Sequence, residues 1–195
     1  MKTRKNNKNK SNKKYTRKQY NSKDGMMTAI WGPSLWHALH SISFNYPVKP
    51  TIQDKINYRN FVLQLKYVLP CGKCRDNFRN NLKKLPLKMK NMKSRATFSR
   101  YIYNLHEVIN EMLNKKSNLT YNEVRDRYEF FRARCKDNKS LKNNVLIMKE
   151  IGCTEPFKGK KSKCILRLVP EDKKCDSFEV DIKKLNWLFI YIIYI

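Results

Sequence analysis

The 195-residue chain contains only 5 glycines, and its 16 acidic residues are outnumbered by 43 Lys and Arg. So few glycines argue against a glycine-rich phosphate-binding loop, a barrel with many tight turns or a collagen-like repeat. No internal repeat recurs at a period of about 20 to 50 residues, which argues against a solenoid. Hydrophobic residues nevertheless make up 41% of the chain, so we expect a packed core rather than complete disorder. The length allows one domain with a modest extension.

A secretory signal is also missing, because the basic start of the chain is not followed by an apolar stretch. The longest apolar run lies at the other end, over residues 185–195, and is interrupted only by Asn186. As a helix this run would span about 16 Å, roughly half of a bilayer core, so it is too short to cross a membrane alone. An edge strand and an interfacial membrane anchor both remain open for it.

Positive charge is concentrated at the N-terminus, although the whole chain carries a formal net charge of +27. Residues 1–23 hold ten Lys and Arg and no acidic residue. We expect residues 1–24 to form a disordered basic arm. Such an arm is either simply solvated or contacts nucleic acid or an anionic membrane.

Apolar residues recur at helical spacing through the middle of the chain. Four stretches each present one apolar face, and they cover residues 30–46, 51–69, 71–85 and 98–113. Pro47, Pro70 and Pro86 follow the first three and would end them. A shorter fifth helix is expected after Thr120, its predicted N-cap, with Glu123 at the capping-box position. Short connections make neighbouring helices antiparallel, so the sequence predicts an all-α fold, a four-helix bundle with a short fifth helix.

The end of the chain has a different pattern. Short strands are expected over residues 164–169 and 177–180, and Gly152, Pro156, Gly159 and Pro170 punctuate this tail, which predicts a small irregular C-terminal appendage. We therefore divide the chain into the basic arm, a helical domain over residues 25–135, and a Cys-containing extension over residues 136–195 with an apolar terminus.

Two of the 6 cysteines form a C-x-x-C motif, Cys71 and Cys74, directly after Pro70 at the start of the predicted third helix. In a chain without a secretory signal, cysteines indicate metal or redox chemistry rather than a disulfide scaffold. Three-residue spacing on a helix puts both sulfurs on one face, close enough for a disulfide. The positive end of the helix, together with Lys73 and Arg75, stabilises a thiolate, which is the form that thiol–disulfide exchange requires.

A structural zinc site is an alternative for the same motif. It needs four ligands, and the second pair should be another C-x2-C or an H-x3–5-H. The remaining cysteines are widely spaced, and His37 with His40 forms only an H-x2-H pair. On the residues alone, the motif is a redox centre, part of a metal site or incidental. The corresponding alternatives for the whole protein are a redox protein, a zinc-stabilised nucleic-acid-binding module, and a membrane-peripheral protein that uses the arm and the apolar terminus.

Two further groups of residues favour a bound cofactor. Trp36 and His40 lie one turn apart on the first predicted helix, and His106 and Asn110 lie one turn apart on the fourth, with Lys115 just beyond it. Each residue alone suits an ordinary bundle seam. Together with the C-x-x-C motif they suggest a planar cofactor held between helices, with an indole to stack on it, polar side chains to hydrogen-bond it and a lysine for phosphate.

In their order and spacing, these motifs resemble the FAD-dependent sulfhydryl oxidases of the Erv/ALR family. The resemblance covers about residues 30–130. It is carried by Trp31-Gly-Pro-Ser-Leu-Trp36-His-Ala-Leu-His40, Tyr46-Pro47, Pro70-Cys71-Gly-Lys-Cys74 and His106-x3-Asn110-x2-Leu113-x-Lys115. The tail around Cys153, Cys164 and Cys175 is similar to the extension on versions carried by large DNA viruses.

The resemblance implies an enzyme, usually a homodimer, that oxidises thiols of protein substrates to disulfides and passes the electrons through FAD to molecular oxygen, giving hydrogen peroxide. It implies that Cys71 and Cys74 are catalytic, with Cys71 receiving electrons from the substrate and Cys74 beside the flavin. The implied FAD contacts are Trp36, His40, Tyr46, Cys74, His106, Asn110, Lys115, Arg127 and Tyr128. No metal is implied. The chain departs from the family pattern at Glu107, where relatives have Asn, and at Asn114, where they usually have Gly.

Relatives often relay electrons through a second, mobile cysteine pair. The candidates here are Cys135, Cys153, Cys164 and Cys175, for which three pairings exist. Alternatively, two of these cysteines form a structural disulfide that stabilises the appendage. The missing signal and the viral resemblance lead us to expect a location in the host cytoplasm or in a virion, with membrane association of residues 185–195 left open.

Overall fold

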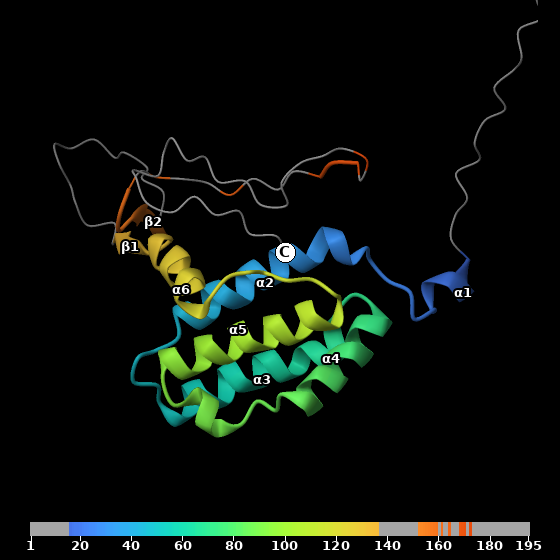
Figure 1. The fold of residues 1–195 in the computed structure, drawn as a ribbon, viewed down its shortest axis with the longest axis horizontal. Helices are drawn as coiled ribbons and strands as arrows, with labels where there is room; N and C mark the ends of the chain where they lie inside the picture. Colours follow the sequence, from blue (N-terminus) through green and yellow to red (C-terminus); the bar gives the residue numbers. More distant parts are fainter. Residues whose placement is uncertain are drawn as a thin grey trace, which may run out of the picture.

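The computed structural model describes residues 16–136 and 152–159, together with residues 161, 164, 168–170 and 172. These residues are mostly helical (Figure 1). The helices are α1 (Arg17–Tyr20), α2 (Thr28–Phe44), α3 (Ile52–Val68), α4 (Gly72–Lys84), the 3-10 helix η1 (Met89–Met92), α5 (Arg95–Met112) and α6 (Tyr121–Phe130). The strands are β1 (Ala133–Lys136) and β2 (Gly152–Pro156).

Polar caps fix where the long helices begin. Thr51, Ser94 and Thr120 each accept a hydrogen bond from the backbone N–H three residues later and form capping boxes at the starts of α3, α5 and α6. The box at Thr120 uses the Glu123 carboxylate, as the sequence predicts. At α4 the N-cap is Cys71, so a redox-capable side chain occupies a position where a small polar residue is usual.

The long helices α2, α3, α4 and α5 form a bundle, in which α2 and α4 pack against α5 and α3 packs against α4. Their apolar faces enclose one core, whose fully buried members include Val62, Phe98, Ile102 and Leu105. The short helix α6 packs on α2 over a second cluster of buried residues. The predicted four-helix bundle with a short fifth helix is confirmed.

The N-terminal arm differs from its prediction where the structure describes it. Residues 1–15 lie outside the described residues, but Arg17–Tyr20 form α1, and residues 21–27 lead from it to α2. Thr16 caps α1 through a capping box with Gln19, which explains why a helix forms in so polar a segment. Part of the predicted basic arm, residues 16–24, is thus described by the structure and includes the short helix α1.

The small C-terminal appendage includes a short hairpin with an irregular register. Strands β1 and β2 pair antiparallel, with Ala133 opposite Pro156 and a register irregularity between Arg134 and Lys136. The strand expected at residues 164–169 is not seen at its described positions 164, 168 and 169, and residues 177–180 lie outside the described part. Because β1 begins at Ala133, it also crosses the boundary predicted between residues 135 and 136.

The hairpin is attached to the bundle at the C-terminal end of α2. The Arg132 guanidinium donates to the Phe44 carbonyl oxygen at 2.8 Å, and the Phe157 N–H donates to the Arg132 carbonyl oxygen at 2.8 Å. Among the described residues, no helix is both long enough and apolar enough to cross a membrane. The predicted apolar terminus, residues 185–195, lies outside that description.

Candidate active site

The C-x-x-C motif forms a disulfide at the first turn of α4. Cys71 and Cys74 are bonded, with their Cα atoms 5.1 Å apart. Cys71 has extended backbone angles, and its sulfur accepts a hydrogen bond from the Cys74 backbone N–H at 3.1 Å. The expected juxtaposition of the two sulfurs at a helix N-terminus is thus present. Cys74 also packs against the bundle core, so its side chain is the inner member of the pair.

A strap formed by residues 21–27 crosses the start of α4 beside the disulfide. The Gly72 N–H donates to the Lys23 carbonyl oxygen at 3.0 Å, and the Met26 N–H donates to the Pro70 carbonyl oxygen at 2.9 Å. A Cβ atom at Gly25 would lie only 1.9 Å from the Pro70 carbonyl oxygen. Glycine is therefore required at position 25 for the strap to lie this close to the active-site backbone.

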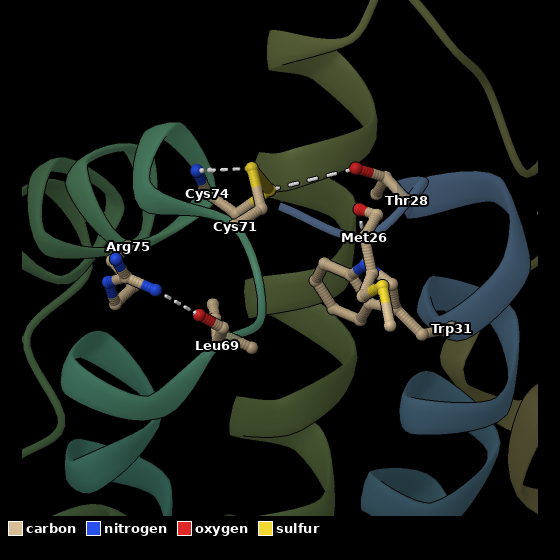
Figure 2. The surroundings of a disulfide bond; sticks show 7 residues. All are labelled: Met26, Thr28, Trp31, Leu69, Cys71, Cys74 and Arg75. Carbon is tan, nitrogen blue, oxygen red and sulfur yellow. Dashed lines mark hydrogen bonds between the residues drawn. A yellow bond between two sulfur atoms is a disulfide. The ribbon is translucent and has the colours of Figure 1, made fainter. Parts of the chain in front are cut away.

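Thr28 follows the strap as the first residue of α2 and faces the disulfide. Its Oγ1 lies 3.6 Å from Cys74 Sγ (Figure 2). The Arg75 side chain points the other way and donates to the Leu69 carbonyl oxygen at 2.5 Å. The Arg75 guanidinium is therefore hydrogen-bonded to a backbone carbonyl at the end of α3 rather than to either sulfur.

A second group of predicted residues meets between α2 and α5. The rings of Trp36 and His106 are stacked, with centroids 3.9 Å apart and planes inclined by 9°. His40 Nε2 and His106 Nδ1 lie 3.0 Å apart in a buried hydrogen bond. Tyr128 of α6 packs on His40, with ring centroids 5.3 Å apart, and its hydroxyl is hydrogen-bonded to His37 Nδ1 at 3.2 Å.

Both histidines of this pair are neutral at physiological pH. Burial, with a smaller contribution from the neighbouring His37, lowers the pKa of His40 to about 4. Burial also lowers the pKa of His106 to about 3, with smaller contributions from His40 and Lys115. Since each neutral ring carries one proton, a single N–H lies between the two rings.

The outer nitrogens of the pair, His40 Nδ1 and His106 Nε2, are buried and lack a hydrogen-bond partner in the described structure. Whichever ring donates the shared hydrogen bond, one outer nitrogen is left as a donor and the other as an acceptor. Unpaired buried polar atoms are costly, so the pair is suited to a ligand that offers one acceptor and one donor. The Arg127 Nη1 atom is also buried and unpartnered among the described residues.

The remaining polar residues that were predicted to contact the cofactor on this helix lie at or just beyond the C-terminal end of α5. Asn110 is buried, and its side-chain N–H donates to the Glu107 carboxylate at 3.0 Å. Asn114 has φ of 54°, the left-handed conformation that Gly and Asn adopt most readily, so this departure from the family pattern keeps the backbone turn. Lys115 and Glu107 line a cavity of about 740 Å³ between the end of α5 and residues 116–120.

Tyr46 is placed away from these candidates. It is fully buried in the core, where its ring packs against Tyr58 and Phe98 and its hydroxyl donates to the Met92 carbonyl oxygen at 2.9 Å. The structure gives Tyr46 a packing role and does not bring it to the Trp36–His106 stack. Its position just after the C-terminus of α2 explains this, because His40 and Trp36 lie about one and two turns before the last residue of that helix.

The four candidate shuttle cysteines are divided by the structure. Cys135 and Cys153 form a disulfide across the β1–β2 hairpin, which is one of the three pairings. Cys164 is exposed and unpaired among the described residues, and Cys175 lies outside them. The two disulfides lie at opposite ends of α2, whose 17 residues span about 25 Å. The hairpin pair is therefore remote from Cys71 and Cys74 within one subunit.

The sequence prediction missed the strap and Thr28. Residues 21–24 end the stretch that was predicted to be a solvated basic arm, and Thr28 is 46 residues away from Cys74 in the sequence. The one local signal was Gly25, because a glycine at the end of the arm in a glycine-poor chain indicates a close backbone approach. No group of three or more potential metal ligands is present within the described residues, which leaves the zinc alternative without support.

The site lies inside a region that matches a known family. The model of the Erv1/Alr family matches residues 33–129. A protein of Acanthamoeba polyphaga mimivirus named "Probable FAD-linked sulfhydryl oxidase" is 39% identical over 94 residues, which cover 48% of this chain and 65% of that protein, just under two thirds of its length. The FAD-linked sulfhydryl oxidase of an African swine fever virus isolate is 30% identical over 51% of this chain and 80% of its own length.

Among solved structures, the FAD-binding domain of Erv1 from Saccharomyces cerevisiae is similar to 53% of this chain and 94% of that domain, with a TM-score of 0.48 and 26% sequence identity. The residues matched by the family model, 33–129, include the disulfide at α4 and the histidine pair. The chain belongs to the Erv1/Alr family.

Proposed function

We propose that this protein is an FAD-dependent thiol oxidase that forms disulfides in protein substrates and passes the electrons to molecular oxygen, giving hydrogen peroxide. The observation that carries the proposal is the Cys71–Cys74 disulfide at the N-terminus of α4. A disulfide in this position is an oxidant for thiols, because the positive end of the helix stabilises the thiolate that is released when the bond is broken.

The order of the two cysteines follows from their surroundings. Cys74 packs against the core, whereas Cys71 lies at the N-cap, next to the strap. A substrate thiolate therefore attacks Cys71, which forms a mixed disulfide and releases Cys74 as a thiolate. A second substrate thiolate then attacks the substrate sulfur of the mixed disulfide, which forms the product disulfide and releases Cys71. The substrate has lost two electrons, and the cysteine pair has gained them.

The residues present fit a flavin. The outer nitrogens of His40 and His106 offer one donor and one acceptor, and the edge of a flavin ring carries both acceptors and an N–H. Trp36 supplies an aromatic face beside them, and Lys115 at the neighbouring cavity suits a phosphate. FAD, when bound, supplies the two-electron acceptor for the cysteine pair and the reactivity toward oxygen. The protein holds the cofactor and keeps both histidines neutral.

A second copy of the chain is the proposed partner. Trp31, Leu35, Leu65, Val68, Leu69 and Pro70 line an apolar groove of about 300 Å³ between α2 and α3. Exposed apolar side chains flank it, including Ile30 with 41% and Tyr67 with 58% of their surface exposed. Such a surface on a small protein favours self-association. Sedimentation of the wild type and of Val68→Glu tests this, since the charge should produce a monomer.

The remaining contacts are also proposals. A location in the host cytoplasm or in a virion is consistent with the relatives from large DNA viruses. The basic arm is proposed to contact nucleic acid or an anionic membrane, with binding that weakens steeply as salt rises. Vesicles and duplex DNA, each with a protein lacking residues 1–15 as the control, would separate these partners from simple solvation of the arm.

The test of the proposed function begins with the absorbance spectrum of the purified protein. We expect a flavin spectrum, together with consumption of oxygen and production of hydrogen peroxide when a dithiol is added. Cys71→Ser and Cys74→Ser should each abolish oxygen consumption with a small dithiol. Cys164→Ser, which removes a cysteine that is exposed and unpaired among the described residues, serves as the control and should leave that consumption unchanged. A colourless wild-type protein, or one whose oxygen consumption survives the loss of Cys71, would refute the proposal.

A further inference from the structure

We propose that Thr28 is a catalytic residue whose hydroxyl holds the Cys74 sulfur and stabilises its thiolate when the Cys71–Cys74 disulfide is opened. The inference rests on the proposed thiol oxidase function and adds a residue to it. Thr28 Oγ1 lies 3.6 Å from Cys74 Sγ, which is a hydrogen-bond distance for sulfur. Within the described part of the chain, this is the side-chain hydroxyl that reaches that sulfur.

The two sulfurs are supported in different ways. Cys71 Sγ accepts the Cys74 backbone N–H, which belongs to the N-cap geometry of α4 and does not depend on another side chain. Cys74 Sγ has no such backbone donor in the described structure, and its polar neighbour is the Thr28 hydroxyl. The inner thiolate is therefore stabilised by a side chain that can be replaced without disturbing α4.

Arg75, Lys23 and Arg79 are engaged elsewhere, while Lys73, between the two cysteines, is exposed. Arg75 donates to the Leu69 carbonyl oxygen, and the Lys23 ammonium lies 3.6 Å from the Asp76 carboxylate, which also pairs with Arg79. None of these contacts brings a cation to Cys74 Sγ. Because none of these cations is paired with Cys74 Sγ, the stabilisation of the Cys74 thiolate by the Thr28 hydroxyl should be measurable.

The helix that carries Thr28 also stabilises a negative charge on Cys74 Sγ. Thr28 is the first residue of the 17-residue helix α2, and Met27 at its N-cap provides no side-chain cap. The positive end of α2 therefore lies against Cys74, as the positive end of α4 lies at Cys71. Two helix N-termini meet at one disulfide, and Thr28 connects the second of them to the inner sulfur.

The step that Thr28 assists is the release of Cys74. A bond forms between the substrate sulfur and Cys71 Sγ while the bond between Cys71 Sγ and Cys74 Sγ breaks, and the electron pair of the broken bond remains on Cys74 Sγ. The Thr28 hydroxyl donates to this new thiolate. A leaving thiol with a lower pKa leaves faster, and a stabilised reduced form makes the disulfide a stronger oxidant.

The first test measures the equilibrium of the full-length protein with glutathione buffers. Thr28→Val keeps the shape of threonine but removes the hydroxyl, whereas Thr28→Ser keeps the hydroxyl. We expect Thr28→Val to stabilise the Cys71–Cys74 disulfide about tenfold, which is about 30 mV toward more reducing potentials for a two-electron couple. Thr28→Ser should stay within about twofold of wild type. A valine variant within twofold of wild type, or a serine variant shifted as far as the valine one, would overturn the inference.

The second test follows the Cys74 thiol directly in a Cys71→Ser background, with the other cysteines replaced by serine. The rate of alkylation by iodoacetamide at neutral pH reports the thiolate fraction. Adding Thr28→Val should slow alkylation about tenfold, and adding Thr28→Ser should not; an unchanged rate with valine would count against the hydrogen bond. Neither test requires flavin or oxygen. A wild type without oxidase activity would thus refute the proposed function alone, and an active protein with an unshifted valine variant would refute only the role of Thr28.

Discussion

The buried histidine pair predicts an unusual dependence of stability on pH. His40 and His106 are 4% and 8% exposed, and burial lowers their pKa values from the ordinary 6.5 to about 4 and about 3. Between pH 6.5 and these lower values the unfolded chain binds more protons than the folded protein. The stabilising contribution is therefore complete above about pH 6.5 and is lost as the pH falls.

The magnitude follows from the two pKa values of each group. Between pH 7 and pH 5, each histidine should lower the free energy of unfolding by about 2 kcal/mol, or about 4 kcal/mol together. Most carboxylates titrate below this window, so the histidines dominate it. The chain has 3 histidines, and the third, His37, is less buried, with its pKa lowered by that partial burial.

Urea titrations at pH 7 and pH 5 measure this loss. His106→Gln should be less stable than wild type at pH 7 but should lose about 2 kcal/mol less on going to pH 5. His37→Gln is the matched control and should reduce the loss by a smaller amount, because the His37 ring is only partly buried. If His106→Gln lost as much free energy as wild type between the two pH values, His106 would not be held neutral by burial and the reasoning would be wrong.

Two further predictions concern the parts that surround the site. Replacing Cys135 and Cys153 together by Ser opens a loop with a sequence separation of 18, so hairpin amides should exchange hydrogen on the order of 100-fold faster, from about 3 kcal/mol of loop entropy. Oxidation of a small dithiol should be unchanged, and a large fall in that rate would contradict the separation of the two disulfides along α2. Gly25→Ala should displace the strap and accelerate tryptic cleavage after Lys23, since its Cβ would overlap a backbone oxygen. Gly32→Ala, whose Cβ meets its nearest neighbour at 3.5 Å, is the control, and equal cleavage of the two variants would show that the strap does not depend on Gly25.

The bundle and the disulfide could be predicted because their determinants are local. Apolar periodicity and the prolines between helices indicate the four long helices, and the capping box after Thr120 is contained in four consecutive residues. The same holds for Cys71 and Cys74, whose spacing within one helical turn is sufficient to juxtapose their sulfurs.

The parts that were missed depend on contacts between distant segments. The hydrogen bond between His40 and His106 joins α2 to α5, and the contact between Thr28 and Cys74 joins α2 to α4, so neither leaves a local pattern. The hairpin was missed because β1 has only four residues, two of them charged, and none of them is β-branched or aromatic. Its pairing is stabilised by a disulfide to a strand that begins 16 residues later.

The most direct test of electron transfer through Cys74 is the anaerobic reduction of the bound flavin by a dithiol in a stopped-flow instrument. We expect the flavin absorbance of the wild type to be lost within the time of one turnover. Cys74→Ser, with the same flavin bound, should retain its absorbance for at least 100 times as long, because the electrons have no route from Cys71. Equal rates for the two proteins would show that the dithiol reduces the flavin without Cys74, and the central claim would be wrong.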